Sequence, residues 1–144
     1  SATFIGDGHH LPAETLTAML RAKGVSRSIL VSDTTSLGGM PPGRYSERIG
    51  GEVELSADGR LSITGTVYLA GAALSLGEMV VRTAAMTGLP IDQALRLATE
   101  NPGLFVGGRG RLAVGAAADI IRFGWQPGQR SFGPDSVILK GNLL

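Results

Sequence analysis

One short stretch constrains this chain more than any other: an apolar run that stops at a carboxylate. Residues 29–31 (Ile-Leu-Val) form a continuous apolar block, which is typical of a strand buried on both faces in a parallel sheet. Asp33 then falls at the carboxyl end of that strand, where catalytic side chains of α/β barrels lie. The alternative is that Asp33 only opens a turn into the Thr34-Thr35 pair and the glycines that follow.

A second apolar run lies upstream and ends in a different polar segment. Residues 3–5 (Thr-Phe-Ile) are followed by residues 6–10 (Gly-Asp-Gly-His-His), whose glycines allow a tight turn and an open loop. Between the two runs, apolar residues recur at helical spacing after Pro12, and Gly24 is placed to end that helix. The order predicts a β-α-β unit with parallel strands.

The middle of the chain changes to an antiparallel pattern. Residues 45–49, 52–55 and 61–63 alternate between polar and apolar residues, and Asp58-Gly59 separates the last two runs. An Asp-Gly pair between alternating runs is a strong hairpin signal. We therefore expect a small antiparallel sheet here.

Helices are predicted again after residue 74. Ser75 and Glu78 have the spacing of a capping box, and Gly88 is placed to end the helix that the box begins. Pro90 opens a further helix, which Asn101-Pro102 is expected to close. Two more strands are expected at about residues 119–123 and 137–140.

Composition excludes several classes of function. The 144 residues carry a net charge of +1 with no basic stripe, so nucleic acid is not an expected partner. The absence of cysteine excludes disulfides and thiolate metal sites and fits a cytoplasmic protein. No apolar run approaches the roughly 20 residues of a membrane span, and Ser1-Ala2-Thr3 is not typical of a signal peptide. We expect no membrane association.

Several motifs occur in a recognisable order. They are Asp7-Gly8-His9-His10, the strand ending at Asp33, Leu69-Ala70-Gly71, Asn101-Pro102 and the segment 112–120. The series resembles the C-terminal portion of the N-acetylglucosamine-6-phosphate deacetylases of the amidohydrolase superfamily. The segment 112–120 identifies only the superfamily, whereas the Asp-Gly-X-His and Leu-Ala-Gly motifs point to the amino-sugar deacetylases.

The resemblance implies an α/β fold with two parts. Residues 1–110 would be the C-terminal part of a TIM-like (β/α)8 barrel, with a β-insertion at about 44–64. Residues 111–144 would be strands of a small β-sandwich domain. The chain would then be a fragment of the enzyme, inactive by itself.

The resemblance also implies roles for single residues. Asp33 matches the family's catalytic aspartate, a general base that takes a proton from metal-bound water and then protonates the departing amine. His10 matches the substrate-binding histidine, which contacts the sugar or its phosphate. Leu69, Ala70 and Gly71 match a loop that closes against the substrate.

The family's divalent metal, expected to be Zn²⁺, would be held mainly by residues upstream of this chain. The chain has two histidines, and they are adjacent. Neighbouring side chains on an extended run point to opposite faces, so His9 and His10 are not expected to share a metal. His9 and Asp7 are assigned structural roles.

The implied reaction converts N-acetylglucosamine 6-phosphate to glucosamine 6-phosphate and acetate. Two alternatives stay open: another amidohydrolase of the cyclic-amide hydrolase type, and a non-catalytic sugar-phosphate-binding module. Two barrel strands alone would leave an exposed edge. We therefore expect the chain to form a homo-oligomer (dimer) or to pack against the remainder of its own barrel.

Overall fold

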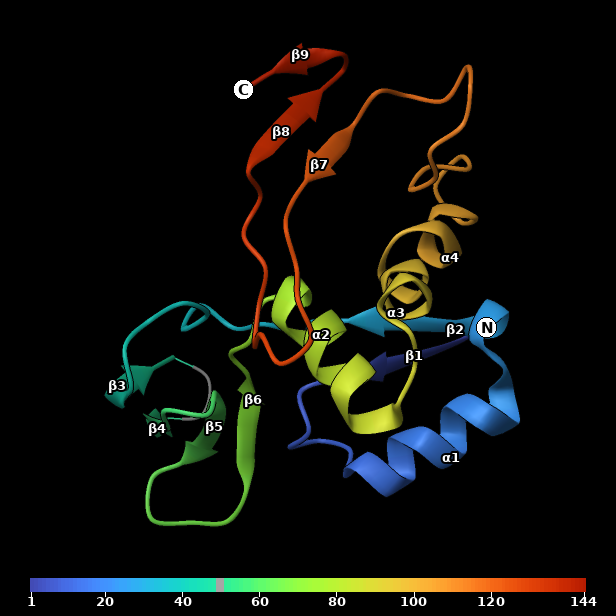
Figure 1. Ribbon diagram of the computed structural model, residues 1–144. Helices are drawn as coiled ribbons and strands as arrows, with labels where there is room; N and C mark the ends of the chain where they lie inside the picture. The colour runs from blue at the N-terminus through green and yellow to red at the C-terminus, as the bar shows by residue number, and fades with distance from the viewer. Residues whose placement is uncertain (49–50) are drawn as a thin grey trace.

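The computed structural model describes residues 1–48 and 51–144 (Figure 1). The predicted strand 45–49 runs into residues 49–50, so its end lies outside the described residues. In chain order, the elements of the structure are β1 (Ala2–Ile5), α1 (Ala13–Lys23), the 3₁₀ turn η1 (Val25–Arg27), β2 (Ser28–Val31), β3 (Gly43–Glu47), β4 (Gly51–Leu55), β5 (Arg60–Ile63), β6 (Leu69–Ala72), α2 (Leu76–Thr87), α3 (Ile91–Ala98), α4 (Glu100–Gly103), β7 (Ile120–Arg122), β8 (Ser136–Leu139) and β9 (Asn142–Leu143).

The expected β-α-β unit is confirmed. β1 and β2 pair in parallel, with Phe4 opposite Leu30, and α1 connects them (Figure 1). Helix α1 begins directly after Pro12 and ends at Gly24, whose N–H donates to the Leu20 carbonyl at 2.8 Å. Both strands therefore end at the same edge, and the loops that follow them are neighbours.

Helices α2 and α3 pack against this unit, and together they form the largest core. Residues from β1, α1, β2, α2 and α3 pack together in it: Phe4, Leu16, Leu20, Leu30, Val80, Ala84, Ala94 and Leu97. Burying each of its Phe, Leu and Val side chains contributes roughly 1.5–3 kcal/mol, so this cluster contributes strongly to stability. No helix within the described ranges combines the length and apolar character needed to cross a bilayer.

The capping box of α2 is confirmed. The Ser75 hydroxyl accepts from the Glu78 N–H at 3.2 Å, and the Glu78 carboxylate accepts from the Ser75 N–H at 2.8 Å. Gly88 ends the helix in the left-handed conformation, with φ of 70°. Two local signals thus set both ends of α2.

The predicted end of α3 at Asn101-Pro102 is wrong. Helix α3 ends at Ala98, and both residues lie in the short helix α4. Proline is tolerated there because N–H groups in a first turn have no intrahelical partner. The buried Asn101 amide donates to the Val25 and Ser28 carbonyls at 2.8 and 2.7 Å, so it anchors α4 to the start of β2.

The antiparallel sheet in the middle of the chain is confirmed and is larger than expected. Its strand order is β3-β4-β5-β6, and Asp58-Gly59 lies in the turn between β4 and β5. Strand β6 was not predicted as a strand. Its Ala72 also forms a parallel bridge with Thr34, which connects this sheet to the loop after β2.

The C-terminal strands form a separate three-stranded antiparallel sheet. β7 and β8 confirm the strands expected near 119–123 and 137–140, and β9 completes the sheet. The sheet extends away from the helices in Figure 1. Within the loop between β7 and β8, Phe123 and Phe132 stack with ring centroids 4.0 Å apart, and Phe132 packs against the main core.

Candidate functional site

The loops after β1 and β2 share one cavity. Asp33 and His10, the two residues singled out most strongly by the sequence, both line it. The cavity has a volume of about 540 Å³, and its other walls come from strands β1 and β2 and from the end of the loop before α1: Thr3, Phe4, Ile5, Val31 and Leu11. The structure therefore brings a carboxylate and an imidazole together in a largely apolar hollow.

Asp33 lies two residues beyond the end of β2 and is exposed. Its φ of 48° places the backbone in the left-handed region, which L-residues other than glycine, asparagine and aspartate rarely adopt. Among the described residues, its carboxylate has no hydrogen-bond or ion-pair partner. The side chain is thus free to accept a proton or a ligand's hydrogen bond.

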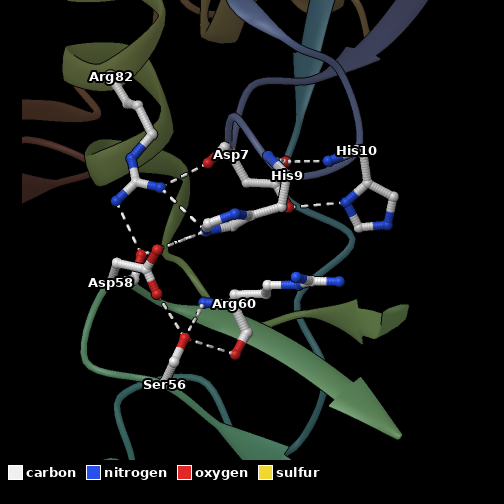
Figure 2. Close-up of polar contacts among 7 residues, drawn as sticks. All are labelled: Asp7, His9, His10, Ser56, Asp58, Arg60 and Arg82. Atoms are coloured by element: carbon white, nitrogen blue, oxygen red, sulfur yellow. Dashed lines mark hydrogen bonds and ion pairs between the residues drawn. The ribbon is translucent and has the colours of Figure 1, made fainter. Parts of the chain in front are cut away.

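His10 is held by the aspartate three residues before it. The Nδ1 atom of His10 lies 2.7 Å from Oδ2 of Asp7, and Oδ1 of Asp7 accepts from the N–H groups of His9 and His10 at 2.9 Å each (Figure 2). Asp7 is only 1% exposed. Burial by itself raises the pKa of Asp7, but the hydrogen bonds from His10 and His9 outweigh it and lower the pKa below its usual value.

His9 faces a different set of partners. Arg82 of α2 donates from Nη1 to the Asp7 carbonyl at 2.5 Å and lies 3.2 Å from Nε2 of His9. Its Nη2 donates to the Asp58 carbonyl at 2.9 Å. Figure 2 shows the rings of His9 and His10 in separate surroundings. Arg82 therefore ties together the loop after β1, helix α2 and the β4–β5 turn.

The Leu-Ala-Gly motif lies elsewhere. The resemblance implies a loop at Leu69, Ala70 and Gly71, but the structure has them in strand β6, and they are not among the residues that line the cavity. A Cβ on Gly71, whose φ is 124°, would lie 2.6 Å from Cγ2 of Thr35. β6 thus packs closely against the segment that directly follows Asp33.

A metal centre does not fit the described part of the chain. No three His, Cys, Asp or Glu side chains there are grouped so that they could hold a metal ion. The Nδ1 atom of His10 and the carboxylate of Asp7 are already bound to each other. These residues therefore provide no ligand set for the divalent metal that the amidohydrolase family generally uses.

Sequence reasoning missed two contacts of this region. Asp7 was assigned a structural role, which fits the loop that it holds, but its contact with His10 was not anticipated, although the i, i+3 spacing in a glycine-rich turn is a usable signal for it. Arg82 gave no signal, because its contact with Asp7 spans 75 positions of sequence.

The chain matches known proteins over most of its length. The amidohydrolase family matches residues 5–144. A putative N-acetylgalactosamine-6-phosphate deacetylase of Escherichia coli K12 is 34% identical over 121 residues, which cover 81% of this chain and 70% of that protein. An N-acetylglucosamine-6-phosphate deacetylase of Vibrio furnissii is 31% identical over 143 residues, 97% of this chain but 34% of that protein.

Solved structures match nearly the whole chain in fold. The N-acetyl-D-glucosamine-6-phosphate deacetylase of Mycobacterium smegmatis aligns with a TM-score of 0.80 and 26% identity, over 99% of this chain and 37% of the solved one. The Pasteurella multocida deacetylase aligns with a TM-score of 0.81 and 22% identity, over 99% and 36%. The chain thus spans little more than a third of these structures and shares the fold of that part. It belongs to the amidohydrolase family.

Proposed function

We propose that this chain is the C-terminal portion of a deacetylase acting on N-acetyl amino-sugar 6-phosphates. Residues 1–110 would supply the last two strands of a TIM-like barrel, with the β-insertion at 44–64, and residues 111–144 would supply strands of a small β-sandwich domain. The parallel β1-α1-β2 unit and the likeness to solved deacetylases support this assignment. Consecutive parallel strands joined by a helix are the building block of such barrels.

The observation that carries the proposal is the shared cavity of Asp33 and His10. Asp33 is the proposed general base and acid. Its carboxylate accepts a proton from the attacking water as the C–O bond to the acetyl carbonyl forms. It then donates that proton to the sugar nitrogen as the C–N bond breaks, so that acetate and a free amine leave.

The remaining proposed contacts hold the substrate. His10 is proposed to bind the sugar at the cavity wall. Leu69, Ala70 and Gly71 are proposed to close against the substrate; they lie in β6 outside the cavity lining, and Gly71 packs on Thr35, in the segment after Asp33. The proposed metal is Zn²⁺, bound mainly by residues absent from this chain. An aspartate-to-alanine mutant of the M. smegmatis deacetylase was solved in complex with N-acetyl-D-glucosamine-6-phosphate, and that likeness supports the substrate class.

The relatives differ in the sugar that they are named for. One acts on N-acetylgalactosamine 6-phosphate and another on N-acetylglucosamine 6-phosphate. The two sugars differ only in the orientation of one ring hydroxyl, so both are candidate substrates.

The test is amine release from both sugars by the full-length protein that contains this sequence, beside its Asp33→Asn and Asp92→Asn variants. Asp92 lies exposed in the first turn of α3 and serves as the matched control. We expect Asp33→Asn to lower kcat by about 10²- to 10⁴-fold, the usual contribution of general acid–base catalysis. An active parent whose Asp33→Asn variant keeps full activity would show that Asp33 is only a turn residue. A parent inactive on both sugars would contradict the substrate assignment.

A further inference from the structure

We infer that Asp7 is a positioning residue that fixes the proton of His10 on Nδ1, so that Nε2 accepts a hydrogen bond from a hydroxyl of the substrate. The inference rests on the proposed function, because it assigns His10 to ligand binding. It goes further by naming the atom of His10 that meets the ligand and the residue that selects it.

The first step concerns the proton between Asp7 and His10. An ionised carboxylate can only accept hydrogen bonds. Asp7 is buried, and its Oδ1 atom already accepts from two backbone N–H groups. Its pKa lies below the usual value, so the carboxylate is ionised at neutral pH. The 2.7 Å contact with Nδ1 of His10 must then be an N–H donated by the ring.

The second step concerns how firmly this arrangement is held. The two backbone hydrogen bonds to Oδ1 fold the loop 7–10 around the carboxylate. Arg82 holds the same loop from the other side through the Asp7 carbonyl. Because Gly6 packs directly against Thr83 of α2, with no room for a Cβ, the loop has little freedom to move away. The ring of His10 is therefore preorganised before any ligand arrives.

The third step concerns the chemistry left for the ligand. With Nδ1 committed to Asp7, Nε2 is the other ring nitrogen, and Figure 2 shows it directed away from Asp7. In a neutral imidazole whose Nδ1 carries the proton, Nε2 is an acceptor. In that neutral form, which the inference assigns to His10, Nε2 accepts from a hydroxyl group of the sugar, whereas a doubly protonated ring would donate from Nε2 to an ionised phosphate oxygen.

The substitution Asp7→Asn tests this point with little disturbance. The Asn oxygen can keep both backbone hydrogen bonds, whereas its NH₂ group can only donate toward Nδ1 of His10. Nδ1 must then become the acceptor, and the proton of the ring moves to Nε2. The variant thus reverses the hydrogen-bonding character of His10 and preserves the fold of the loop.

Nitrogen NMR of the full-length protein labelled with ¹⁵N-histidine shows which ring nitrogen of His10 carries the proton. The His10→Gln variant identifies the resonances of His10. We expect the Nδ1 resonance of His10 to be of the protonated type in the parent and of the unprotonated type in Asp7→Asn. Asp58→Asn is the matched control, because Asp58 also accepts local hydrogen bonds but lies near His9. Protonation of Nε2 in the parent, or an unchanged ring in Asp7→Asn, would overturn the inference.

Kinetics provide a second readout through a double-mutant cycle. Loss of a matched hydrogen bond to substrate predicts a rise in KM of roughly 5- to 150-fold in Asp7→Asn. If Asp7 acts through His10, the same substitution has little further effect in a His10→Gln background. An equal effect in both backgrounds would mean that Asp7 only supports the fold.

Failure of this inference can be distinguished from failure of the proposed function. The NMR measurement needs no turnover, so it tests the tautomer even if the protein is inactive on both sugars. Conversely, an active parent with an unprotonated Nδ1 would keep the proposed function and remove Asp7 from its mechanism.

Discussion

Two aspartates lie at the ends of neighbouring parallel strands, and their surroundings differ completely. Asp7, after β1, is 1% exposed and accepts three hydrogen bonds from the two residues that it holds. Asp33, after β2, is exposed and stands in the left-handed backbone region. One carboxylate is fully engaged in shaping its loop, and the other is left available.

The comparison shows that two aspartates at the same edge of a sheet can have different roles, because their surroundings differ. A buried carboxylate must be matched by donors, so it fixes the groups around it and cannot easily change its protonation state. An exposed carboxylate beside a cavity can exchange protons. The engaged residue therefore suits positioning, and the available one suits acid–base chemistry.

The largest expected difference between the two is in turnover. We predict that Asp33→Asn lowers kcat at least tenfold more than Asp7→Asn does, because only Asp33 is proposed to carry the proton. Steady-state assays of the full-length protein, with both variants measured side by side, give the ratio. Equal losses of kcat would contradict the assignment of proton transfer to Asp33 and of positioning to Asp7.

For the free energy of unfolding we expect the opposite order, with the larger loss at Asp7. We predict that Asp7→Ala lowers the free energy of unfolding by about 1–3 kcal/mol, because it leaves the partly buried N–H groups of His9 and His10 without their acceptor. Asp33→Ala should change it by no more than about 1 kcal/mol. Urea unfolding at neutral pH measures both, and a larger loss for Asp33→Ala would contradict the assigned roles.

The stabilisation by Asp7 should depend on pH in a defined direction. Its folded pKa is lowered, so its contribution is present above the unfolded value of about 3.9 and is lost as pH falls through the folded pKa. We expect the parent to be more stable than Asp7→Asn at pH 7 and this difference to shrink as pH falls into that acidic range. Denaturation curves between pH 7 and pH 3 test this. A difference that widens on acidification would show the opposite sign of the shift.

The smallest expected effect concerns backbone strain. Lys140 is the other non-glycine residue with positive φ among the described residues, at 50°. Replacement of Lys140 by Gly should stabilise the fold by up to about 1 kcal/mol, and Asp33→Gly by less than about 0.5 kcal/mol, because Asp tolerates this region better than Lys. Thermal unfolding ranks the two variants. A larger gain at Asp33 would indicate strain held at the proposed catalytic residue.

Much of the fold follows local rules and was predicted correctly. The buried strand before Asp33, the helix between Pro12 and Gly24, and the capped ends of α2 depend on residues within a few positions of one another. The placement of Asp33 and His10 near each other was also foreseeable, because parallel strands end at one edge.

Strand β6 and the exposure of Met19 could not be predicted from local sequence. The Leu-Ala-Gly-Ala segment has little strand propensity, and it becomes β6 because it pairs with β5 and with Thr34. Met19 shares the helical spacing of Leu16 and Leu20 but is 44% exposed, so apolar spacing alone does not identify the buried face of α1.

The sequence by itself determined the strand ends, the helix caps and the motifs that carry the resemblance, because each depends on short-range steric and hydrogen-bonding preferences. Only the tertiary structure decided how deeply each aspartate is buried. The carboxylate of Asp7 is bound by its near neighbours His9 and His10, but its burial depends on groups brought from distant positions, as Arg82 is brought to the backbone carbonyl of Asp7. The chemical character of each carboxylate is therefore a property of the folded chain.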